Sequence, residues 1–283
     1  MRRAAAIAIS HGGGPMPVLG DQNHKDIVSS LRTRVPAILK LGTPSAPRAI
    51  VVVTAHWSTS RPTISSAPRH ALLYDYGGFP AAAYSLKYDA PGSPSVAEEV
   101  RQALAEAGLE PVMDSKRGWD HGVFIPFLLI NPKADVPIVQ LSVLESEDPA
   151  QHLAMGRALS ALRDTNVAVV GSGFASFHNL PAMRQLMMAA GPGQLKGRTD
   201  EWNAALTSAV GESDGGKREE RLKRWRELPH AYDMHPRYGA EHFLPLLVVT
   251  GAAEEGKDGG VKAYKDGFIG VDIWTYYWGD VEV

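Results

Sequence analysis

Four histidines stand in separate turn-like segments, each beside an apolar run that predicts a strand or a buried helix. They are His11 in SHGGGP, His56 in TAHW, His178 in FHN and His242 in EHFLP. Histidines at the ends of such elements can converge from distant parts of a chain, and a neutral imidazole serves both as a metal ligand and as a proton acceptor. The pattern therefore predicts a metal site together with a catalytic base.

The first two histidines also have simpler interpretations. His11 precedes Gly12–Gly14, which suits a tight turn as well as close approach to a ligand. A phosphate-binding loop fits poorly, because no lysine follows at Walker spacing and no GxGxxG pattern is present. His56 follows the strand-like Val51–Val53 run, at the strand end where α/β proteins bind ligands, although a capped strand-end histidine fits too. Trp57, the next residue, is placed to wall an apolar pocket.

Two more histidines border predicted helix starts. His121 lies in GWDHG, where Asp120 has the alternative role of capping a helix over Val123–Leu129. His178 precedes Asn179-Leu180-Pro181. A helix N-terminus disfavours protonation of a nearby imidazole, which suits a base that is neutral at rest.

A proline and a glycine shortly before Ala240 indicate that a helix begins near that residue, with Glu241 and His242 in its first turn. Helical neighbours diverge by about 100°, so these two side chains are not expected to point into one site. We assign no chemistry to the remaining histidines, which are expected in a loop (His235) or in polar and helical-surface contexts (His24, His70, His152 and His230).

The sequence has no cysteine, so any metal must be held by His, Asp or Glu. Neutral imidazoles, often with one carboxylate, suit iron or zinc and leave positions open for substrate and O2. His11, His56 and His242 can be matched as such a set, and Glu241 is the one acid in the right neighbourhood.

Composition and net charge limit the class of protein. The 283 residues carry a net charge of −2, with 44% hydrophobic and 21% charged residues, which is ordinary for a globular protein and gives no case for nucleic acid or an anionic membrane. No apolar stretch reaches the roughly 20 residues of a membrane span.

The N-terminal segment, basic and then apolar, is similar to a signal peptide. Its apolar part is short and runs directly into His11, so it predicts a first strand instead. Absence of cysteine favours a cytoplasmic location.

Apolar runs that predict strands alternate with helix-like segments. The predicted strands are Ala4–Ile9, Ala49–Thr54, Val136–Leu144 and Val167–Gly171. The predicted helices are Asp26–Leu39, Ser93–Ala107, Pro149–Arg163, Thr199–Val210 and Lys217–Arg226, with Phe243–Thr250 a further apolar element. This alternation predicts a single α/β domain over residues 1–283, with a central, mostly parallel sheet and helices on both faces. Gly211–Glu227 is expected as a surface excursion, and Trp274–Trp278 as a terminal strand or the interface of a homo-oligomer.

Eight stretches, in order along nearly the whole chain, together resemble the class III extradiol ring-cleavage dioxygenases, the superfamily of the protocatechuate 4,5-dioxygenase catalytic subunit. The DOPA dioxygenase branch is resembled most. The stretches are Ser10–Met16, Val51–Trp57, Tyr74–Pro80, Tyr88–Pro94, Gly118–Gly122, Pro137–Ser142, Gly171–Leu180 and Glu241–Leu246. Each is weak alone, whereas eight in order are specific. The third glycine of Gly12–Gly14 and the charged Gly211–Glu227 segment depart from the family's pattern.

The resemblance implies a role for each site histidine. The metal ligands would be His11, His56 and His242. The catalytic acid/base would be His178, and His121 would face substrate and oxygen. Side chains of the matching stretches expected to contact the substrate are Trp57, Asp120 and Phe79.

The implied reaction is Fe(II)-dependent cleavage of L-DOPA, or a related single-ring catechol, with O2 to a muconic semialdehyde. Zn(II) would then be an inactive stand-in for iron in a purified sample. Two alternatives stay open at this point. One is a zinc-dependent hydrolase, and the other is a non-catalytic signalling or redox protein resembling Memo on the same fold.

Overall fold

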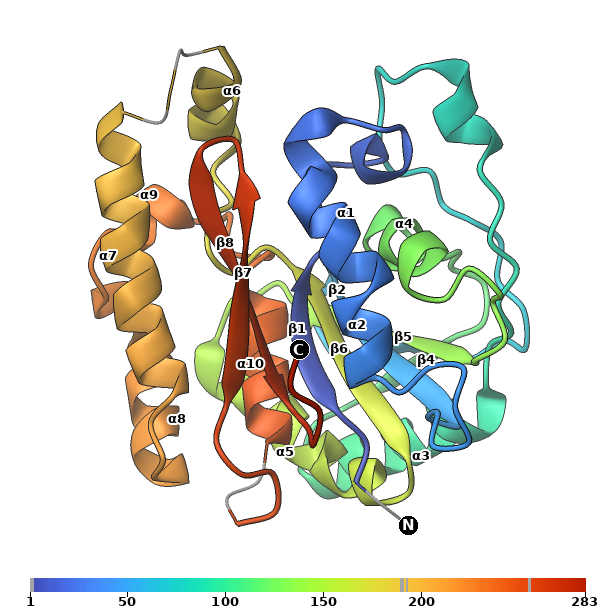
Figure 1. The fold of residues 1–283 in the computed structure, drawn as a ribbon. Coiled ribbons are helices and arrows are strands. Elements are labelled where there is room, and N and C mark those ends of the chain that lie inside the picture. Colours follow the sequence, from blue (N-terminus) through green and yellow to red (C-terminus); the bar gives the residue numbers. More distant parts are fainter. Residues whose placement is uncertain (1–2, 189–190, 192, 254–255) are drawn as a thin grey trace.

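A computed structural model describes residues 3–188, 191, 193–253 and 256–283. Its strands are β1 (Ala6–Ser10), β2 (Ala49–Thr59), β3 (Thr63–Ser65), β4 (Val112–Asp114), β5 (Ile138–Leu144), β6 (Val167–Gly173), β7 (Lys262–Phe268) and β8 (Val271–Trp278). They form one eight-stranded sheet in the order β4-β3-β5-β2-β6-β1-β8-β7 (Figure 1). The central strands β5, β2, β6 and β1 pair in parallel, while β3 and β8 join their two edges in antiparallel orientation.

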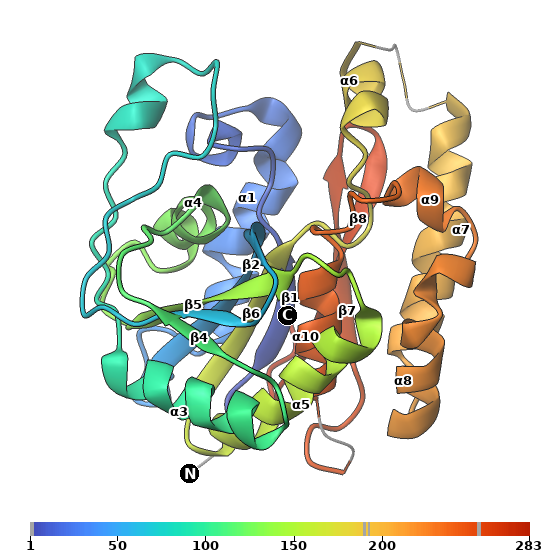
Figure 2. The same cartoon turned by 180° about the vertical axis from the view of Figure 1, so that it is seen from behind.

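Helices cover both faces of this sheet. The α-helices are α1 (Lys25–Arg32), α2 (Arg34–Ile38), α3 (Pro94–Glu106), α4 (His121–Ile130), α5 (Pro149–Asp164), α6 (Leu180–Met188), α7 (Gly193–Val210), α8 (Gly215–Lys223), α9 (Ala231–Met234) and α10 (Leu244–Ala252). Short 3-10 turns span η1 (Met16–Val18), η2 (Gln22–His24), η3 (Ala81–Ser85) and η4 (Trp225–Glu227). Figure 1 shows α1, α2 and α4 on one face, and Figure 2 shows α3, α5 and α10 on the other. The single α/β domain predicted from the alternation is confirmed.

Two glycines let α5 and α10 pack backbone to backbone. A Cβ on Gly156 would lie 2.0 Å from the carbonyl oxygen of Val248, and one on Gly251 would lie 2.2 Å from that of Leu153. No larger residue fits either position without separating the helices. This contact holds α10 close to β6 and β1, and so fixes the position of the turn before α10 that carries His242.

The predicted core strands are confirmed within a few residues, and Trp274–Trp278 lies in β8, between β1 and β7. The predicted Asp26–Leu39 helix was wrong as one element. It breaks at Thr33, because Pro36 has no N–H to continue the hydrogen-bond ladder, and resumes as α2. The first two residues of the N-terminal segment lie outside the described part of the chain.

The Gly211–Glu227 segment is not merely a surface excursion. It forms α8 and η4, so the helix predicted over Lys217–Arg226 ends at Lys223. Leu222 and Trp225 are fully buried, and the Trp225 ring lies 4.2 Å from the Phe243 ring. The segment therefore belongs to the core that supports the start of α10.

Two histidines expected in polar or surface contexts are completely buried. The His24 Nε2 accepts the Gly13 N–H at 2.9 Å, and its Nδ1 lies 2.6 Å from Asp21. The His152 Nε2 accepts the Leu144 N–H at 3.0 Å, and its Nδ1–H donates to the Asp148 carbonyl at 2.7 Å. Both rings satisfy backbone groups at element ends, a role that hydropathy patterns do not reveal.

Burial lowers the pKa of His152 to about 4, against about 6.5 in an unfolded chain. The unfolded state therefore binds the extra proton, and this contribution to stability is lost as pH falls from about 6.5 to about 4, by about 3 kcal/mol. We expect His152→Leu to lower the free energy of unfolding at neutral pH by about 1–3 kcal/mol, because the Leu144 N–H loses its acceptor. The free energy of unfolding of both proteins should be measured with urea at several pH values. We expect the difference between them to become smaller towards pH 4. A gap independent of pH would contradict the assignment.

Candidate metal centre

Parallel strand pairing brings the first two histidines to one edge of the sheet. Strand β6 lies between β1 and β2 and pairs in parallel with both. His11 directly follows β1. His56 lies where the pairing of β2 with β5 skips from Thr54 to Ser58, a bulge of the kind that re-aims side chains. Both imidazoles are thereby placed towards the carboxyl ends of the two strands that flank β6, at the edge where open α/β sheets bind ligands.

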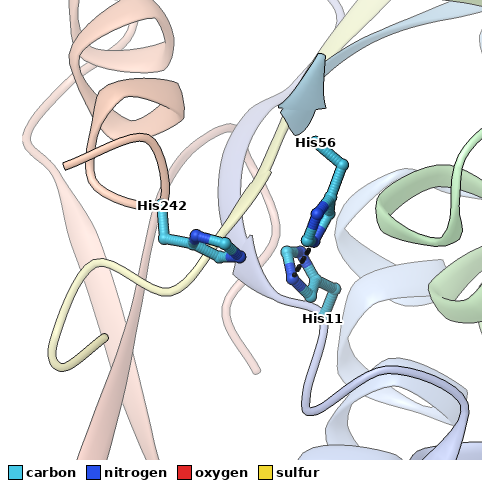
Figure 3. A group of neighbouring side chains, drawn as sticks. All are labelled: His11, His56 and His242. Carbon is cyan, nitrogen blue, oxygen red and sulfur yellow. Dashed lines mark hydrogen bonds between the residues drawn. The ribbon is translucent and has the colours of Figure 1, made fainter. Parts of the chain in front are cut away.

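His242 joins them from the turn before α10. Its carbonyl oxygen accepts the N–H of Phe174, just past β6, at 2.8 Å. The expectation that Glu241 and His242 fall in a first helical turn was wrong, because α10 begins at Leu244. Figure 3 shows the three rings of His11, His56 and His242 pointing toward one another.

Hydrogen bonds at Nδ1 leave a lone pair on Nε2 of both His11 and His242. Ser172 donates its hydroxyl hydrogen to the Gly122 carbonyl, so its oxygen accepts the His11 Nδ1–H at 3.0 Å and leaves Nε2 of His11 unprotonated. That Nε2 accepts a hydrogen bond from Nε2–H of His56 at 3.2 Å, the dashed line in Figure 3. The Nδ1–H of His242 donates to Glu241 at 2.9 Å, which leaves Nε2 of His242 available in turn. The ligand atoms of the three histidines all lie within 4.8 Å of one another.

This donor set fits one metal ion. Nitrogens bound about 2.0–2.1 Å from a common ion lie about 3 to 3.4 Å apart, which the 3.2 Å separation of the His11 and His56 nitrogens matches. Burial, followed by repulsion from neighbouring histidines, lowers the pKa of His11, His56 and His242 well below the usual value. All three are therefore neutral at neutral pH, as metal ligands must be.

Two further histidines complete the cluster. The His178 ring stacks on His242 with centroids 3.4 Å apart and planes at 14°, and the His121 ring lies 3.7 Å from that of His56. Burial, with a smaller effect of His121, lowers the pKa of His178 to about 4. The structure thus brings together all five histidines that the sequence singled out.

Two carboxylates at this cluster were not predicted as site residues. Asp75 accepts both the backbone N–H and the Nδ1–H of His121, at 2.9 and 2.8 Å. Burial would raise the pKa of Asp75, but these bonds outweigh it and hold the pKa below its usual value. Glu241 was expected to point away from the site, yet its Oε1 lies 2.9 Å from Nδ1 of His242 and 3.7 Å from Nδ1 of His178. Asp75 lies in a motif noted above, but nothing local marks it as a partner of His121.

The residues expected to contact substrate are placed around this cluster at different depths. Phe79 packs on Tyr76, whose ring lies 5.6 Å from that of His121. Trp57 is buried with its ring against the Arg117 guanidinium at 4.8 Å. For each of them, contact with substrate stays a prediction.

Asp120 lies behind His56. It occupies the N-cap position of α4 but makes no side-chain cap bond, and instead accepts the Thr54 hydroxyl at 2.8 Å. Burial raises its pKa to about 6. Arg117, which sequence reasoning missed, donates to Asp120 and, at 3.0 Å, to the carbonyl oxygen of His56. These groups brace the backbone that carries the His56 imidazole, and contact of Asp120 with substrate likewise stays a prediction.

The fold and the cluster of neutral histidines fit a metal-dependent α/β enzyme. Residues 5–272 match the family described as the catalytic LigB subunit of aromatic ring-opening dioxygenase, and the chain belongs to this family. It is therefore an extradiol dioxygenase, an oxidoreductase, which favours that interpretation over the hydrolase and the non-catalytic alternatives. Among the described helices, none is long and apolar enough to span a bilayer.

Named relatives agree with this assignment. The chain is 52% identical over 290 residues to dioxygenase tasH of Hapsidospora irregularis, covering 100% of this chain and 88% of that one. It is 34% identical over 267 residues to a 4,5-DOPA dioxygenase extradiol of Beta vulgaris, covering 90% and 92%. The crystal structure of an uncharacterized protein from Escherichia coli K12 matches with a TM-score of 0.75 at 28% identity, covering 98% and 100%.

Gly122 lies close to the His56 ring, so a substitution there tests whether the position of that ring matters for metal binding. A Cβ at this position would lie 2.6 Å from Thr54 Oγ1 and 2.9 Å from Cδ2 of His56. We expect Gly122→Ala to displace the His56 ring and weaken Zn(II) binding about 10-fold or more, as measured by competition with a chelator. Gly197→Ala is the matched control, because Gly197 lies in α7 with nothing within 4 Å of its Cβ position. Equal Zn(II) affinity in both variants would count against His56 as a ligand.

Proposed function

We propose that His11, His56 and His242 hold Fe(II) and that the protein opens the ring of a single-ring catechol with O2 to give a muconic semialdehyde. The observation that carries this proposal is the set of three neutral imidazoles with ligand atoms within 4.8 Å of one another, beside two histidines left free for proton chemistry. Bound at these ligands, the metal ion would lower the pKa of a catechol hydroxyl and hold the ring close to O2.

His178 is proposed as the acid/base. With a pKa of about 4 it is neutral near pH 7, so it can accept a proton. Its Nδ1 is turned towards Glu241, which leaves Nε2 as the nitrogen that takes the remaining catechol proton. The parallel stacking on His242 holds this base next to a proposed metal ligand, and so would place it near a hydroxyl bound there.

His121 is proposed to meet the substrate or O2 from the other flank of the cluster. Its Nδ1–H is engaged by Asp75, so Nε2 is the atom available for a hydrogen bond to charge that develops on the reacting oxygen. The Tyr76 and Phe79 rings continue outward from His121 and supply an aromatic wall for a flat ring.

L-DOPA is the first substrate to test, because relatives of this chain are named 4,5-DOPA dioxygenase extradiol. A cysteine-free sequence supports a cytoplasmic location, and association of the chain with itself remains part of the proposal.

Anaerobic loading with Fe(II), followed by exposure to O2 and a panel of catechols that includes L-DOPA, tests the function directly. We expect O2 uptake matched one to one by a yellow semialdehyde, and loss of both after Fe(II) is removed by a chelator. Zn(II) at the same site should support no O2 uptake, because Zn(II) has no redox chemistry. Turnover that needs zinc but no O2 would establish a hydrolase instead. No reaction with any catechol, despite stoichiometric metal, would overturn the proposal.

His178→Ala tests the proton acceptor. We expect kcat to fall about 100-fold or more, while metal content stays unchanged, because His178 is not among the three proposed ligands. The control is His230→Asn, which removes an imidazole from the N-cap of α9. Asn tolerates the left-handed backbone of that residue, where φ is 60°. Steady-state kinetics on samples of known metal content distinguish the two. Normal turnover by His178→Ala would remove this residue from the mechanism.

A further inference from the structure

Each of the two non-ligand histidines is linked to a proposed metal ligand by one carboxylate. Asp75 lies between His121 and His56, and Glu241 lies between His178 and His242. The two groups reach the cluster from distant parts of the chain, one from the segment before η3 and the other from the turn before α10.

The two links differ in which histidine is held tightly. Asp75 bonds the non-ligand His121 at 2.8 Å, while its distance to Nδ1 of the ligand His56 is 3.8 Å. Glu241 shows the reverse order, with the ligand His242 at 2.9 Å and the non-ligand His178 at 3.7 Å. Only the shorter contact of each carboxylate is a hydrogen bond.

A bond from Nδ1–H to a carboxylate fixes both the tautomer and the orientation of an imidazole, and so sets where its Nε2 points. For His121 a second bond, from the backbone N–H to the same Asp75 oxygen, restrains the carboxylate itself. For His242 the carboxylate comes from the adjacent residue, which is possible because neither residue is in the helix.

We propose that Asp75 and Glu241 are positioning residues with separate tasks: Asp75 orients His121 for turnover, and Glu241 orients His242 for metal binding. This inference rests on the proposed function for the roles of the histidines. It goes beyond that function by giving each carboxylate a role. It predicts that loss of Asp75 mainly lowers kcat and that loss of Glu241 mainly lowers metal affinity.

Isosteric variants separate the two tasks. We expect Asp75→Asn to lower kcat of the Fe(II) enzyme about 10- to 100-fold while Zn(II) affinity changes less than about threefold. We expect Glu241→Gln to weaken Zn(II) binding about 10- to 100-fold, with a smaller change in kcat at saturating Fe(II). Asp75→Glu restores the charge and should recover part of the lost kcat.

A readout independent of turnover is the exchange of ring N–H protons with solvent, followed by NMR on the Zn(II)-loaded protein. Asp75→Asn should speed exchange at Nδ1 of His121 and leave His242 unchanged, and Glu241→Gln should do the opposite. Matched controls are two surface carboxylates that pair with a cation or a histidine, Asp89→Asn beside Arg69 and Glu201→Gln beside His230. Thermal melting checks that every variant folds.

The inference is overturned if Asp75→Asn and Glu241→Gln change kcat equally and Zn(II) affinity equally. It is also overturned if the Nδ1 proton of His121 exchanges as slowly in Asp75→Asn as in the unsubstituted protein. Its failure is distinguishable from failure of the proposed function. If the unsubstituted Fe(II) protein cleaves no catechol, the proposed function fails, whereas Zn(II) affinity and proton exchange still decide what Asp75 and Glu241 do.

Discussion

Three neutral imidazoles that converge in one buried space are the constraint on which this structure depends. Burial keeps His11, His56 and His242 neutral, and the nearest two nitrogens lie 3.2 Å apart. Nε2 of His56 and Nε2 of His11 share a hydrogen bond at that separation, and a metal ion bound by the three rings would take the place of its proton. The parallel pairing of β1 and β2 with β6 and the close packing of α5 on α10 maintain this convergence.

Hydrogen bonds to the histidine rings and to the backbone that carries them account for much of the polar core nearby. His11 uses Ser172, which in turn bonds the Gly122 carbonyl at the start of α4. Asp120, from the residue before α4, accepts the Thr54 hydroxyl, and Arg117 bonds both Asp120 and the His56 carbonyl. The start of α4 therefore supports the candidate metal centre as well as the fold. A buried carboxylate of this kind stays in the core because each of its oxygens has a partner.

How much of this could be predicted depends on the range of the interactions. Uniformly apolar runs such as Val51–Val53 predict buried strands. The central sheet and the single domain could therefore be predicted from the sequence. Strands β3 and β4 are three residues long, too short for any periodicity, and β7 places Asp266 at a buried position where the pattern expects an apolar residue. The start of α10 was misplaced because proline and glycine mark a turn but not its length.

The histidines of the candidate site could be predicted from the sequence, but the hydrogen bonds that connect them to their partners could not. Histidines at element ends, together with the family resemblance, identified the five rings. Asp75 and His121 are 46 positions apart and meet only through the fold, so no local spacing connects them. His24 and His152 are as buried as the site histidines, yet Nε2 of each accepts a backbone N–H. Burial alone does not distinguish a ligand from a structural histidine, whereas the partner of each ring nitrogen does.

The cluster also shows why this site has no compact motif. A helical pair such as HExxH holds metal with residues of one element and can be recognised locally. Here His11, His56, Asp75 and His121 come from the N-terminal half of the chain, and His178, Glu241 and His242 come from the C-terminal half. The halves meet at β6, which pairs with β1 and β2 and bonds the turn carrying His242. The candidate site is complete only once these strands have paired, so a metal ion bound by the proposed ligands would stabilise the folded domain.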